Sequence, residues 1–332
     1  MKWPAMWQRK AGTGPGGVSA KPDCEEQPMD TQAQINTQAG KFWDRQLEEL
    51  RTNPLDRIRW WQDETTLRHI NGLLGEPGNS ALHFAFHTQI AKRLKGRRNL
   101  KGVSVGCGMG TKELWLMQMV DIAHFDLFDI AEANIEFGRQ EAQRQGVLHK
   151  VSMRAEDAFL AELADDYDLV YWNNALHHMP DVYAALRWSL DRLKPGGLLA
   201  MDDFIGPSRF QWTDQNLAWA TRVRTTLPPR LLMDPHGNPV SNATVRPTIE
   251  QVKASDPSEA ADSGRTVEAL RAVFPSVEIF PTGGALYHLA LNDIFHNFKS
   301  KEDLTTLRQI LLLDQYLAEH GTTHYGVAFA SK

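Results

Sequence analysis

Three glycines at alternate positions, Gly106, Gly108 and Gly110, are the first residues in this sequence whose spacing could serve chemistry. They follow an apolar run at 101–105 and precede Thr111, where an amphipathic run begins. We expect a strand, a tight turn and the start of a helix, because glycine permits positive φ and lets backbone approach a ligand closely. The free N–H groups at a helix N-terminus attract an anionic or polar ligand. The stretch therefore predicts a nucleotide-type cofactor site.

One carboxylate stands where a ribose would need it. Asp129 ends the next predicted strand, 23 residues after Gly106, and its two oxygens can accept both ribose hydroxyls. Enzymes that use NAD and enzymes that use an adenosyl cofactor share this device, and a cap for the following helix is the alternative use of Asp129. The dinucleotide pattern G-x-G-x-x-G requires a third glycine where this chain has Thr111, which disfavours NAD.

Candidates for acid–base chemistry follow the fourth and fifth predicted strands. His178 comes just after the fourth strand and is the first candidate for a general base, with a structural role as the alternative. Asp202 and Asp203 end the fifth strand, where we expect one to face substrate and the other water. The adjacent side chains of His177 and His178 are expected to point apart, and no Asp-rich cluster matches them, so the sequence predicts no metal site.

Arginines dominate the charge of residues 206–246. A guanidinium group suits bidentate contacts to phosphate or carboxylate, so this imbalance predicts a small or medium-sized anionic acceptor. Solvated surface charge, or pairing with carboxylates elsewhere in the chain, is an equally open interpretation. The substrate-binding candidates are Arg209, Arg222 and Arg224, which together with Arg230 and Arg246 face only Asp214 and Asp234.

The elements that must position these residues alternate from residue 100 onward. Short strands that alternate with longer helices predict a mostly parallel sheet, and ligands of such sheets bind outside the carboxyl ends of the strands. Strands are expected near 101–105, 124–129, 151–154, 168–172, 198–202, 277–280 and 325–330. Helices are expected near 111–120, 131–145, 181–193, 214–225, 267–274, 286–298 and 302–320.

This pattern divides the chain into five parts. Residues 1–33 are rich in Gly, Pro and Gln and predict a flexible tail. Residues 34–98 predict helices that either pack against the core or form a lid over the site. The cofactor-binding core is expected at 99–205, a substrate cap inserted after the fifth strand at 206–264, and the completion of the core at 265–332.

Composition narrows the class of partner. The 332-residue chain has a formal net charge of −5, which makes nucleic acid and anionic membranes unlikely partners. No apolar run reaches the roughly 18 residues of a membrane span, and the N-terminus lacks the apolar core of a secretion signal. Cys24 and Cys107 provide no disulfide framework, which suits the cytoplasm. The oligomeric state is open, with a homodimer among the options.

Motifs further along the chain choose among the cofactors. The run Glu156-Asp157-Ala158 follows the third predicted strand, 168–178 covers the fourth strand and its exit, and 193–199 leads into the fifth. This ordered set, within 99–205, resembles the class I S-adenosylmethionine-dependent methyltransferases. The resemblance implies an α/β fold, a Rossmann-like three-layer sandwich whose seven-stranded sheet is mostly parallel with an antiparallel last strand. The N-terminal helical segment and the cap insertion are additions to it.

The resemblance also implies a role for each matching residue. Asp129 would bind the ribose and Ile130 would pack on the adenine. Asp157 would face the exocyclic amine of the adenine, with Glu156 and Ala158 beside it, and the backbone carbonyl of Asn173 would face the cofactor's amino group. The residues implied to line the methionine end are Gly106, Cys107, Gly108 and Gly110.

The resemblance implies transfer of a methyl group, an in-line displacement at carbon whose driving force the cofactor, S-adenosylmethionine, carries. We expect a small or medium-sized acceptor, with an oxygen nucleophile on an anionic natural-product or sugar-type molecule. The alternatives are methyl transfer to nitrogen or carbon of a small molecule, RNA methylation, and binding of the cofactor without catalysis. The acidic net charge and the run Asn173-Asn174-Ala175-Leu176, which is not an Asn-Pro-Pro-Tyr-type motif, disfavour RNA.

Overall fold

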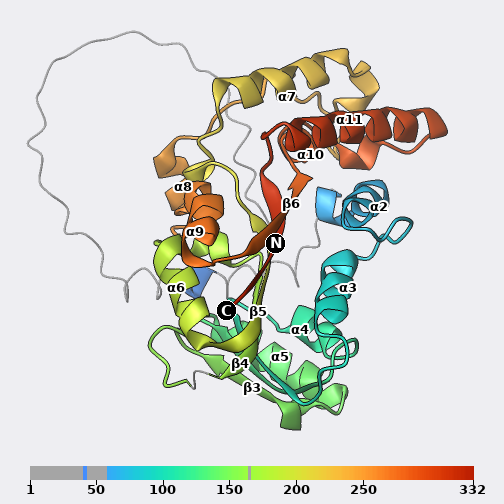
Figure 1. Ribbon diagram of the computed structural model, residues 1–332. Coiled ribbons are helices and arrows are strands. Elements are labelled where there is room, and N and C mark those ends of the chain that lie inside the picture. The colour runs from blue at the N-terminus through green and yellow to red at the C-terminus, as the bar shows by residue number, and fades with distance from the viewer. Residues whose placement is uncertain (1–39, 43–57, 164–165) are drawn as a thin grey trace, which may run out of the picture.

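The computed structural model describes residues 40–42, 58–163 and 166–332 (Figure 1). The predicted tail, 1–33, lies outside these residues, and so does part of the predicted N-terminal helical segment, 34–98. Among the described residues, no helix has both the length and the apolar character needed to cross a membrane.

A sheet of seven strands in the order β3-β2-β1-β4-β5-β7-β6 forms the centre of the molecule. The first five strands are parallel, and β7 runs antiparallel to its neighbours β5 and β6. The predicted sandwich with a mostly parallel sheet and an antiparallel last strand is confirmed. The strands are β1 Leu100–Val105, β2 Ile122–Asp129, β3 Val151–Ala155, β4 Tyr167–Asn173, β5 Leu193–Phe204, β6 Val277–Gly283 and β7 Tyr325–Ser331.

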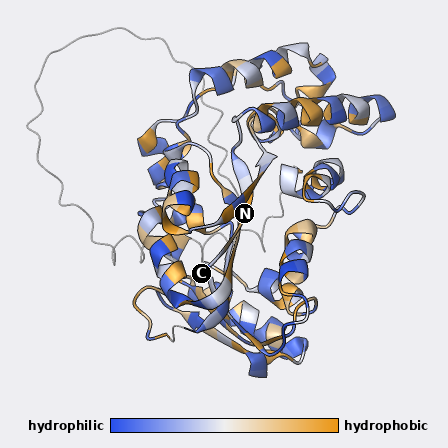
Figure 2. Ribbon diagram, viewed as in Figure 1, coloured by the Kyte–Doolittle hydropathy of each residue, from blue (hydrophilic) through white to orange (hydrophobic). Residues whose placement is uncertain are grey.

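Helices cover both faces of this sheet, which makes three layers. Every residue of β4 is buried, as expected of a parallel strand that is covered on both sides. Leu169 and Tyr171 pack in one apolar cluster with α3, α4 and α5, whereas Val170 and Trp172 pack in another with α6 and α9. Figure 2 shows the central strands largely in orange, while the helices alternate in colour. These helices are α3 Phe84–Arg93, α4 Thr111–Leu116, α5 Glu132–Arg144, α6 Val182–Arg192 and α9 Thr266–Val273.

A third apolar cluster lies beyond the carboxyl ends of the strands. It joins the insertion after β5 to the segment between β6 and β7, so that α7, α10 and α11 lie together (Figure 1). Trp60, from the 3-10 turn Trp60–Gln62, packs in the same cluster. Its ring centroid lies 5.3 Å from that of Tyr287 and 4.9 Å from that of Tyr325. The remaining helices are α2 Glu64–Leu73, α7 Asp214–Thr226, α8 Ile249–Ser255, α10 Tyr287–Leu291 and α11 Lys301–Glu319.

Three sequence predictions about elements need correction. The helix predicted at 286–298 ends at Leu291 and resumes only as the 3-10 turn Phe295–Asn297. The apolar pattern at 58–70 divides into the 3-10 turn Trp60–Gln62 and α2, because Asp63 caps α2 through Thr66 N at 2.8 Å. The insertion also holds α8, which the sequence did not predict and which begins with a capping box at Thr248.

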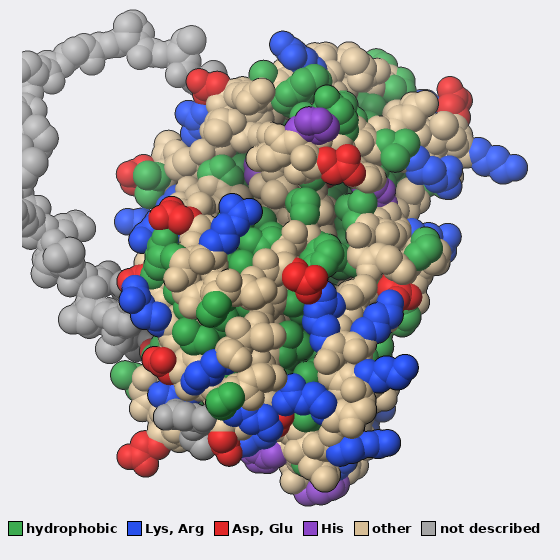
Figure 3. Space-filling view, viewed as in Figure 1, with side chains coloured by type: hydrophobic (Ala, Val, Ile, Leu, Met, Phe, Trp, Pro, Cys, Tyr) green, Lys and Arg blue, Asp and Glu red, His purple; other side chains and the backbone are tan. Residues whose placement is uncertain are grey.

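The basic residues at 92–101 pair with carboxylates. Lys92, Arg93 and Arg97 bond to Glu76, Glu278 and Asp168, at 2.6, 2.6 and 2.5 Å. These pairs tie the segment that connects α3 to β1 to other parts of the fold. Figure 3 shows acidic and basic side chains interspersed over the face in view.

Asp168 at the start of β4 is the most buried carboxylate of this connector. Lys194 and Arg97 both form ion pairs with it, and its second oxygen accepts from Lys101 N at 3.0 Å. Burial raises the pKa of Asp168, but the hydrogen bonds and charges of these partners outweigh burial and hold the pKa below its usual value. Lys194, at the start of β5, therefore ties this strand to β4.

We predict that Asp168→Asn lowers the free energy of unfolding by about 2 kcal/mol, because two cations would lose their charged acceptor. The depressed folded pKa means that the wild type gains this stability above the unfolded pKa of about 3.9 and loses it as pH falls through the folded value. Urea denaturation between acid and neutral pH measures both effects. Asp166→Asn, which removes the exposed partner of Lys101, is the control and should change stability by less than about 1 kcal/mol. Equal losses in the two variants would contradict the prediction.

Candidate cofactor and acceptor site

The glycine turn joins β1 to α4, and all three of its glycines have positive φ, 65°, 57° and 67°. A Cβ on Gly106 would lie 2.7 Å from the Cβ of Ala175, and one on Gly110 would lie 2.8 Å from Cε of Met153. A Cβ on Gly108 would meet no atom within 4 Å. Packing against the rigid Ala175 therefore demands glycine at 106, whereas a Cβ on Gly110 would require the flexible end of Met153 to shift, and Gly108 faces open space in front of the turn.

Asp129 at the end of β2 is bonded directly to this turn. Its Oδ2 accepts from Gly108 N at 2.7 Å and its Oδ1 from Ala131 N at 2.9 Å. Burial raises the pKa of the carboxyl group, against the lowering effect of these two bonds. Asn134 also bonds to this carboxylate, which leaves one of its about four acceptor positions for a ribose hydroxyl. Asp129 is not the cap of α5, because the N-cap is Ala131 and no side chain caps the helix there. Its contact with a ribose stays a prediction.

Further predicted cofactor residues surround the same strand ends. Asp157 follows β3, and its Oδ1 accepts from Phe159 N at 2.9 Å, which shapes a turn. Glu156 beside it is exposed and pairs with Arg154 at 3.1 Å. Ala158 is buried, and Ile130 is half-buried beside Asp129. Their contacts with a cofactor stay predictions.

Cys107 is buried within the turn. Burial raises the pKa of its thiol well above the usual value, and its Sγ lies 3.4 Å from the carbonyl oxygen of Gly108. A reactive thiolate is therefore disfavoured, which agrees with the interpretation of Cys107 as a small buried residue.

A lysine that the sequence analysis left out reaches the predicted methionine end. Lys112 Nζ donates to the carbonyl oxygen of Asn173 at 2.6 Å. That carbonyl is the one expected to face the cofactor's amino group, and it retains a second lone pair for such a contact. The feature of the sequence that could have identified Lys112 is its position in the first turn of the helix that follows the glycines.

The N-terminal segment touches the opposite, adenine side of the candidate site. Gly40 is buried, and a Cβ there would lie 2.8 Å from the carbonyl oxygen of Ile130. Helical residues 40–42 thus lie beside the strand end that carries Asp129. The contact fits packing against the core as well as a lid, so the role of residues 34–98 stays a prediction.

A small crevice that is open to solvent lies next to the exit of β4. Asn174 and Asp202 form one polar wall of it, and His83 faces them from the start of α3. Most of the remaining lining is aromatic or aliphatic and comes from Trp60, Leu67, Ile70, Phe86, Tyr287 and Tyr325. The described lining residues include none from 206–264, the segment under which the sequence placed the acceptor. The insertion instead packs its apolar side chains against α10 and α11.

The polar wall of the crevice contains a carboxylate–histidine pair. His83 Nδ1 lies 2.9 Å from Asp202 Oδ2, and both side chains are largely buried, at 8% and 21% exposure. His83 has a φ of 63°, a left-handed conformation that is uncommon for a residue other than glycine, asparagine or aspartate. Sequence reasoning found Asp202 but missed His83, because the two are 119 positions apart.

Asp203, the neighbour of Asp202, points to the other side of β5 and is fully buried. Its Oδ2 accepts from Ala175 N and Leu176 N at 2.9 and 2.7 Å, and its Oδ1 lies 2.5 Å from His177 Nδ1. Burial lowers the pKa of His177, but the charge of Asp203 and this hydrogen bond outweigh it and raise the pKa to about 9. The sequence predicted that one of these two aspartates faces substrate and the other faces water. Asp203 does not face water, because it is fully buried.

The two adjacent histidines do not point apart. Their ring centroids lie 4.1 Å from each other, because the 3-10 turn Leu176–His178 places both side chains on one side. His178 Nδ1 lies 3.0 Å from Ser258 Oγ in the insertion. Burial and the neighbouring His177 lower the pKa of His178 to about 4. The described lining of the crevice contains neither histidine.

The three arginines proposed for substrate binding have structural contacts. Arg209 Nη1 donates to the carbonyl oxygens of Pro257 and Glu259 at 2.7 and 2.9 Å. Arg224 is buried, forms an ion pair with Asp293 and donates to two backbone carbonyls. Arg222 lies over the ring of Trp219, 5.3 Å from its centroid. The described crevice lining contains none of the three, so their role toward a substrate stays a prediction.

Comparison with known proteins gives a consistent assignment. Residues 97–242 match the family model described as "Methyltransferase domain". The chain is 27% identical over 174 residues to the methyltransferase GfsG of Streptomyces halstedii, which covers 52% of this chain and 59% of that protein. It is 29% identical to 27-O-demethylrifamycin SV methyltransferase of Amycolatopsis mediterranei over 36% of this chain and 45% of that one. It is 30% identical to a ubiquinone biosynthesis O-methyltransferase of Bordetella avium, in an alignment that covers 42% of this chain and 53% of that protein. The chain thus spans about half the length of the curated relatives it matches.

We predict that Gly108→Ala weakens the binding of S-adenosylmethionine by roughly tenfold or more, since a methyl group would enter the open space in front of the turn. Gly146→Ala is a matched control: its φ is also positive, 72° against 57°, and its Cβ would likewise meet no atom within 4 Å. Both variants should lose about 1–2 kcal/mol of stability from the left-handed backbone. Only Gly108→Ala should lose affinity in titration calorimetry, and equal affinities would refute this role for the turn.

Proposed function

We propose that this chain, which belongs through residues 97–242 to the class I S-adenosylmethionine-dependent methyltransferases, transfers a methyl group to a hydroxyl oxygen of a small or medium-sized acceptor. Members of this family use S-adenosylmethionine as the methyl donor. The observation that carries the proposal is the pair His83–Asp202 in the crevice beside the exit of β4.

The position of the His83–Asp202 pair supports a role in methyl transfer. Asp202 is the register partner of Asn173 in the sheet, and Asn174 N donates to the carbonyl oxygen of Asp202 at 2.9 Å. The next residue, Ala175, lies against Gly106 of the glycine turn. The polar wall of the crevice is therefore continuous with the predicted methionine end of the cofactor site.

S-adenosylmethionine would supply an electrophilic methyl group and a neutral thioether leaving group. The chain must hold the acceptor oxygen in line and accept its proton. Asp202 bonds to Nδ1 of His83, which leaves Nε2 for the acceptor hydroxyl. As the oxygen takes the methyl group, its proton would pass to Nε2, and Asp202 would stabilise the charged imidazole. In this proposal Asp202 is a positioning residue and His83 is the base.

Of the predicted catalytic residues, Asp202 alone takes part in the proposal, as the residue that positions His83. Asp203 and His178 contribute to the wall behind the β4 exit rather than to the crevice, and we assign them no proton transfer.

The crevice supports an acceptor with an apolar body. Its described lining contains aromatic and aliphatic side chains and no lysine or arginine. An anionic acceptor, which the arginines of the insertion suggested, gains no support from these contacts. Two of the relatives carry O-methyltransferase names, which supports oxygen as the nucleophile. We propose a natural-product type molecule that presents one hydroxyl on an apolar skeleton. A cytoplasmic location is part of this proposal, and its support is the low cysteine content.

The test is an acceptor screen with methyl-labelled S-adenosylmethionine. A panel of phenols, hydroxyquinones, macrolides and sugars is incubated with the protein, and S-adenosylhomocysteine and labelled product are measured by mass spectrometry. We expect product from an apolar hydroxyl compound, with the label on oxygen. Label on nitrogen or carbon would overturn the choice of nucleophile, and cofactor binding without turnover on any acceptor would favour a binding module.

We predict that His83→Asn lowers kcat by about 10²–10⁴-fold, with KM and cofactor affinity little changed, because it removes the base and leaves the site intact. Asparagine tolerates the left-handed backbone at this position, so the fold should survive. Steady-state kinetics across pH measures the effect, and the residual rate should rise with pH as the acceptor hydroxyl ionises in solution. His124→Asn, on β2 and away from the crevice, serves as the control. An unchanged kcat in His83→Asn would exclude His83 as the base.

A further inference from the structure

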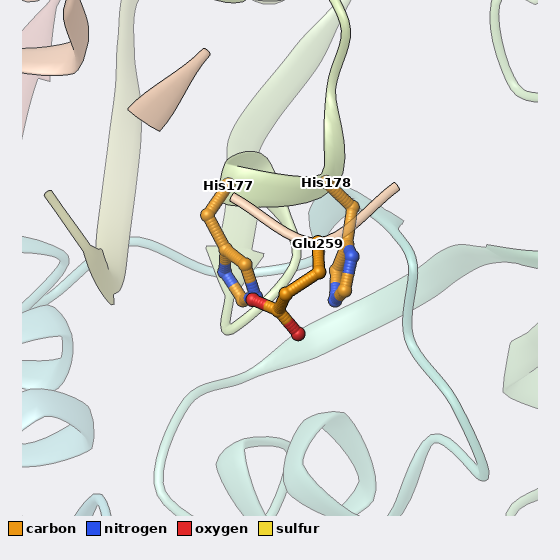
Figure 4. Close-up of side chains that lie close together, drawn as sticks. All are labelled: His177, His178 and Glu259. Carbon is orange, nitrogen blue, oxygen red and sulfur yellow. The ribbon is translucent and has the colours of Figure 1, made fainter. Parts of the chain in front are cut away.

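Two histidines and a glutamate form a compact group behind the β4 exit, apart from the crevice. One nitrogen from each ring of His177 and His178 and one carboxylate oxygen of Glu259 lie within 4.8 Å of one another. Figure 4 shows both rings on the same side of their turn, with the carboxylate of Glu259 directed at the space between them. His177 Nε2 is 3.5 Å from Glu259 Oε1, at the limit of a hydrogen bond.

The residues that contact the two histidines are of the kind that orient the ligands of a metal site. Asp203 holds Nδ1 of His177, which orients the opposite nitrogen toward Glu259. Ser258 Oγ contacts Nδ1 of His178 at 3.0 Å, and this hydroxyl donates to Asp256 Oδ1 at 2.7 Å. Histidines that bind a metal usually have their second nitrogen held in this way by a carboxylate, a carbonyl or water.

Two carboxylate oxygens here are buried and accept no hydrogen bond, Oε1 of Glu259 and Oδ2 of Asp256. Asp256 is only 3% exposed, which makes such an oxygen expensive to bury without a partner. Three carboxylates, those of Asp203, Asp256 and Glu259, lie around the two rings, and Arg209 is the nearby guanidinium that acts on two of them. The carboxylates and the two imidazole rings are donors of the kind that a divalent transition metal ion accepts.

We propose that His177, His178 and Glu259 bind a divalent first-row transition metal ion such as Zn²⁺. Imidazole and carboxylate are the ligands that such ions accept, whereas Mg²⁺ and Ca²⁺ prefer oxygen ligands alone. Tetrahedral zinc with bonds of about 2.1 Å places its ligand atoms about 3.4 Å apart, close to the 3.5 Å between His177 Nε2 and Glu259 Oε1. Small side-chain rotations would bring the third ligand in, and water would complete the coordination.

The ion would act as a clamp between two distant parts of the chain. Glu259 belongs to the insertion after β5, and the histidines belong to the exit of β4. The same two segments already meet at Ala261 N, which donates to the carbonyl oxygen of His177 at 3.0 Å. The metal would thus fix residues 256–262 against the core, a role that depends on no step of the proposed methyl transfer.

The test is metal binding by the full chain after treatment with a chelator. Titration with Co²⁺, followed by visible absorption, and titration calorimetry with Zn²⁺ should give close to one ion per chain. Glu259→Gln and His178→Gln should each weaken binding by at least about tenfold, and Asp256→Asn should weaken it by about 10–100-fold. Zinc should raise the midpoint of thermal unfolding of the wild type and leave that of Glu259→Gln unchanged.

His236→Ala is the control, because His236 is an exposed histidine of the same insertion. It should bind cobalt as the wild type does. Circular dichroism of each variant checks that the fold is kept. Wild-type protein that binds no ion would overturn the proposal, and so would equal affinity in the wild type, Glu259→Gln and His178→Gln, which would place the ion elsewhere. Binding of S-adenosylmethionine, measured on the same samples, separates this outcome from a failure of the methyltransferase proposal.

Discussion

The arrangement of the whole site depends on the carboxylate of Asp203 at the end of β5. It is fully buried and accepts from three backbone N–H groups, those of Ala175, Leu176 and Phe204, and from the ring of His177. A charge in this position is tolerable only because these donors surround it. They fix the path of the chain after β4, and that path brings Ala175 against Gly106. The exit of β4, the glycine turn and the end of β5 are therefore one rigid unit.

The alternation of side chains along β5 gives this unit two faces. Asp202 and Asp203 are neighbours, so they point to opposite sides of the strand, and each holds a histidine. Asp202 holds His83 of the N-terminal segment in the wall of the crevice. Asp203 holds His177 against the insertion. Two adjacent carboxylates thus organise two chemically different environments on either side of one strand end.

How far the sequence could predict this site depends on sequence separation. The glycines, Asp129 and the strand ends were predictable, because each element is local and parallel sheets gather their ligands at one edge. The crevice was not, because Trp60, Tyr287 and Tyr325 meet only after folding. The directions of the His177 and His178 side chains were likewise beyond the sequence, since they depend on the contacts with Asp203 and Ser258. The structural partners of the arginines were hidden for a related reason: they include backbone carbonyls, which no residue pattern reveals.

The crevice and the glycine turn come from different stretches of the chain, and this has a consequence for how the protein can change. The turn, Asp129 and the exit of β4 lie within the matched domain, 97–242, whereas most of the apolar crevice wall comes from 60–86 and 282–325. Substitutions in these outer stretches can reshape the wall without touching a hydrogen bond of the turn. If the turn holds the methyl donor and the crevice holds the acceptor, as proposed, exchange of the flanking segments alone would change the acceptor and leave the donor site intact.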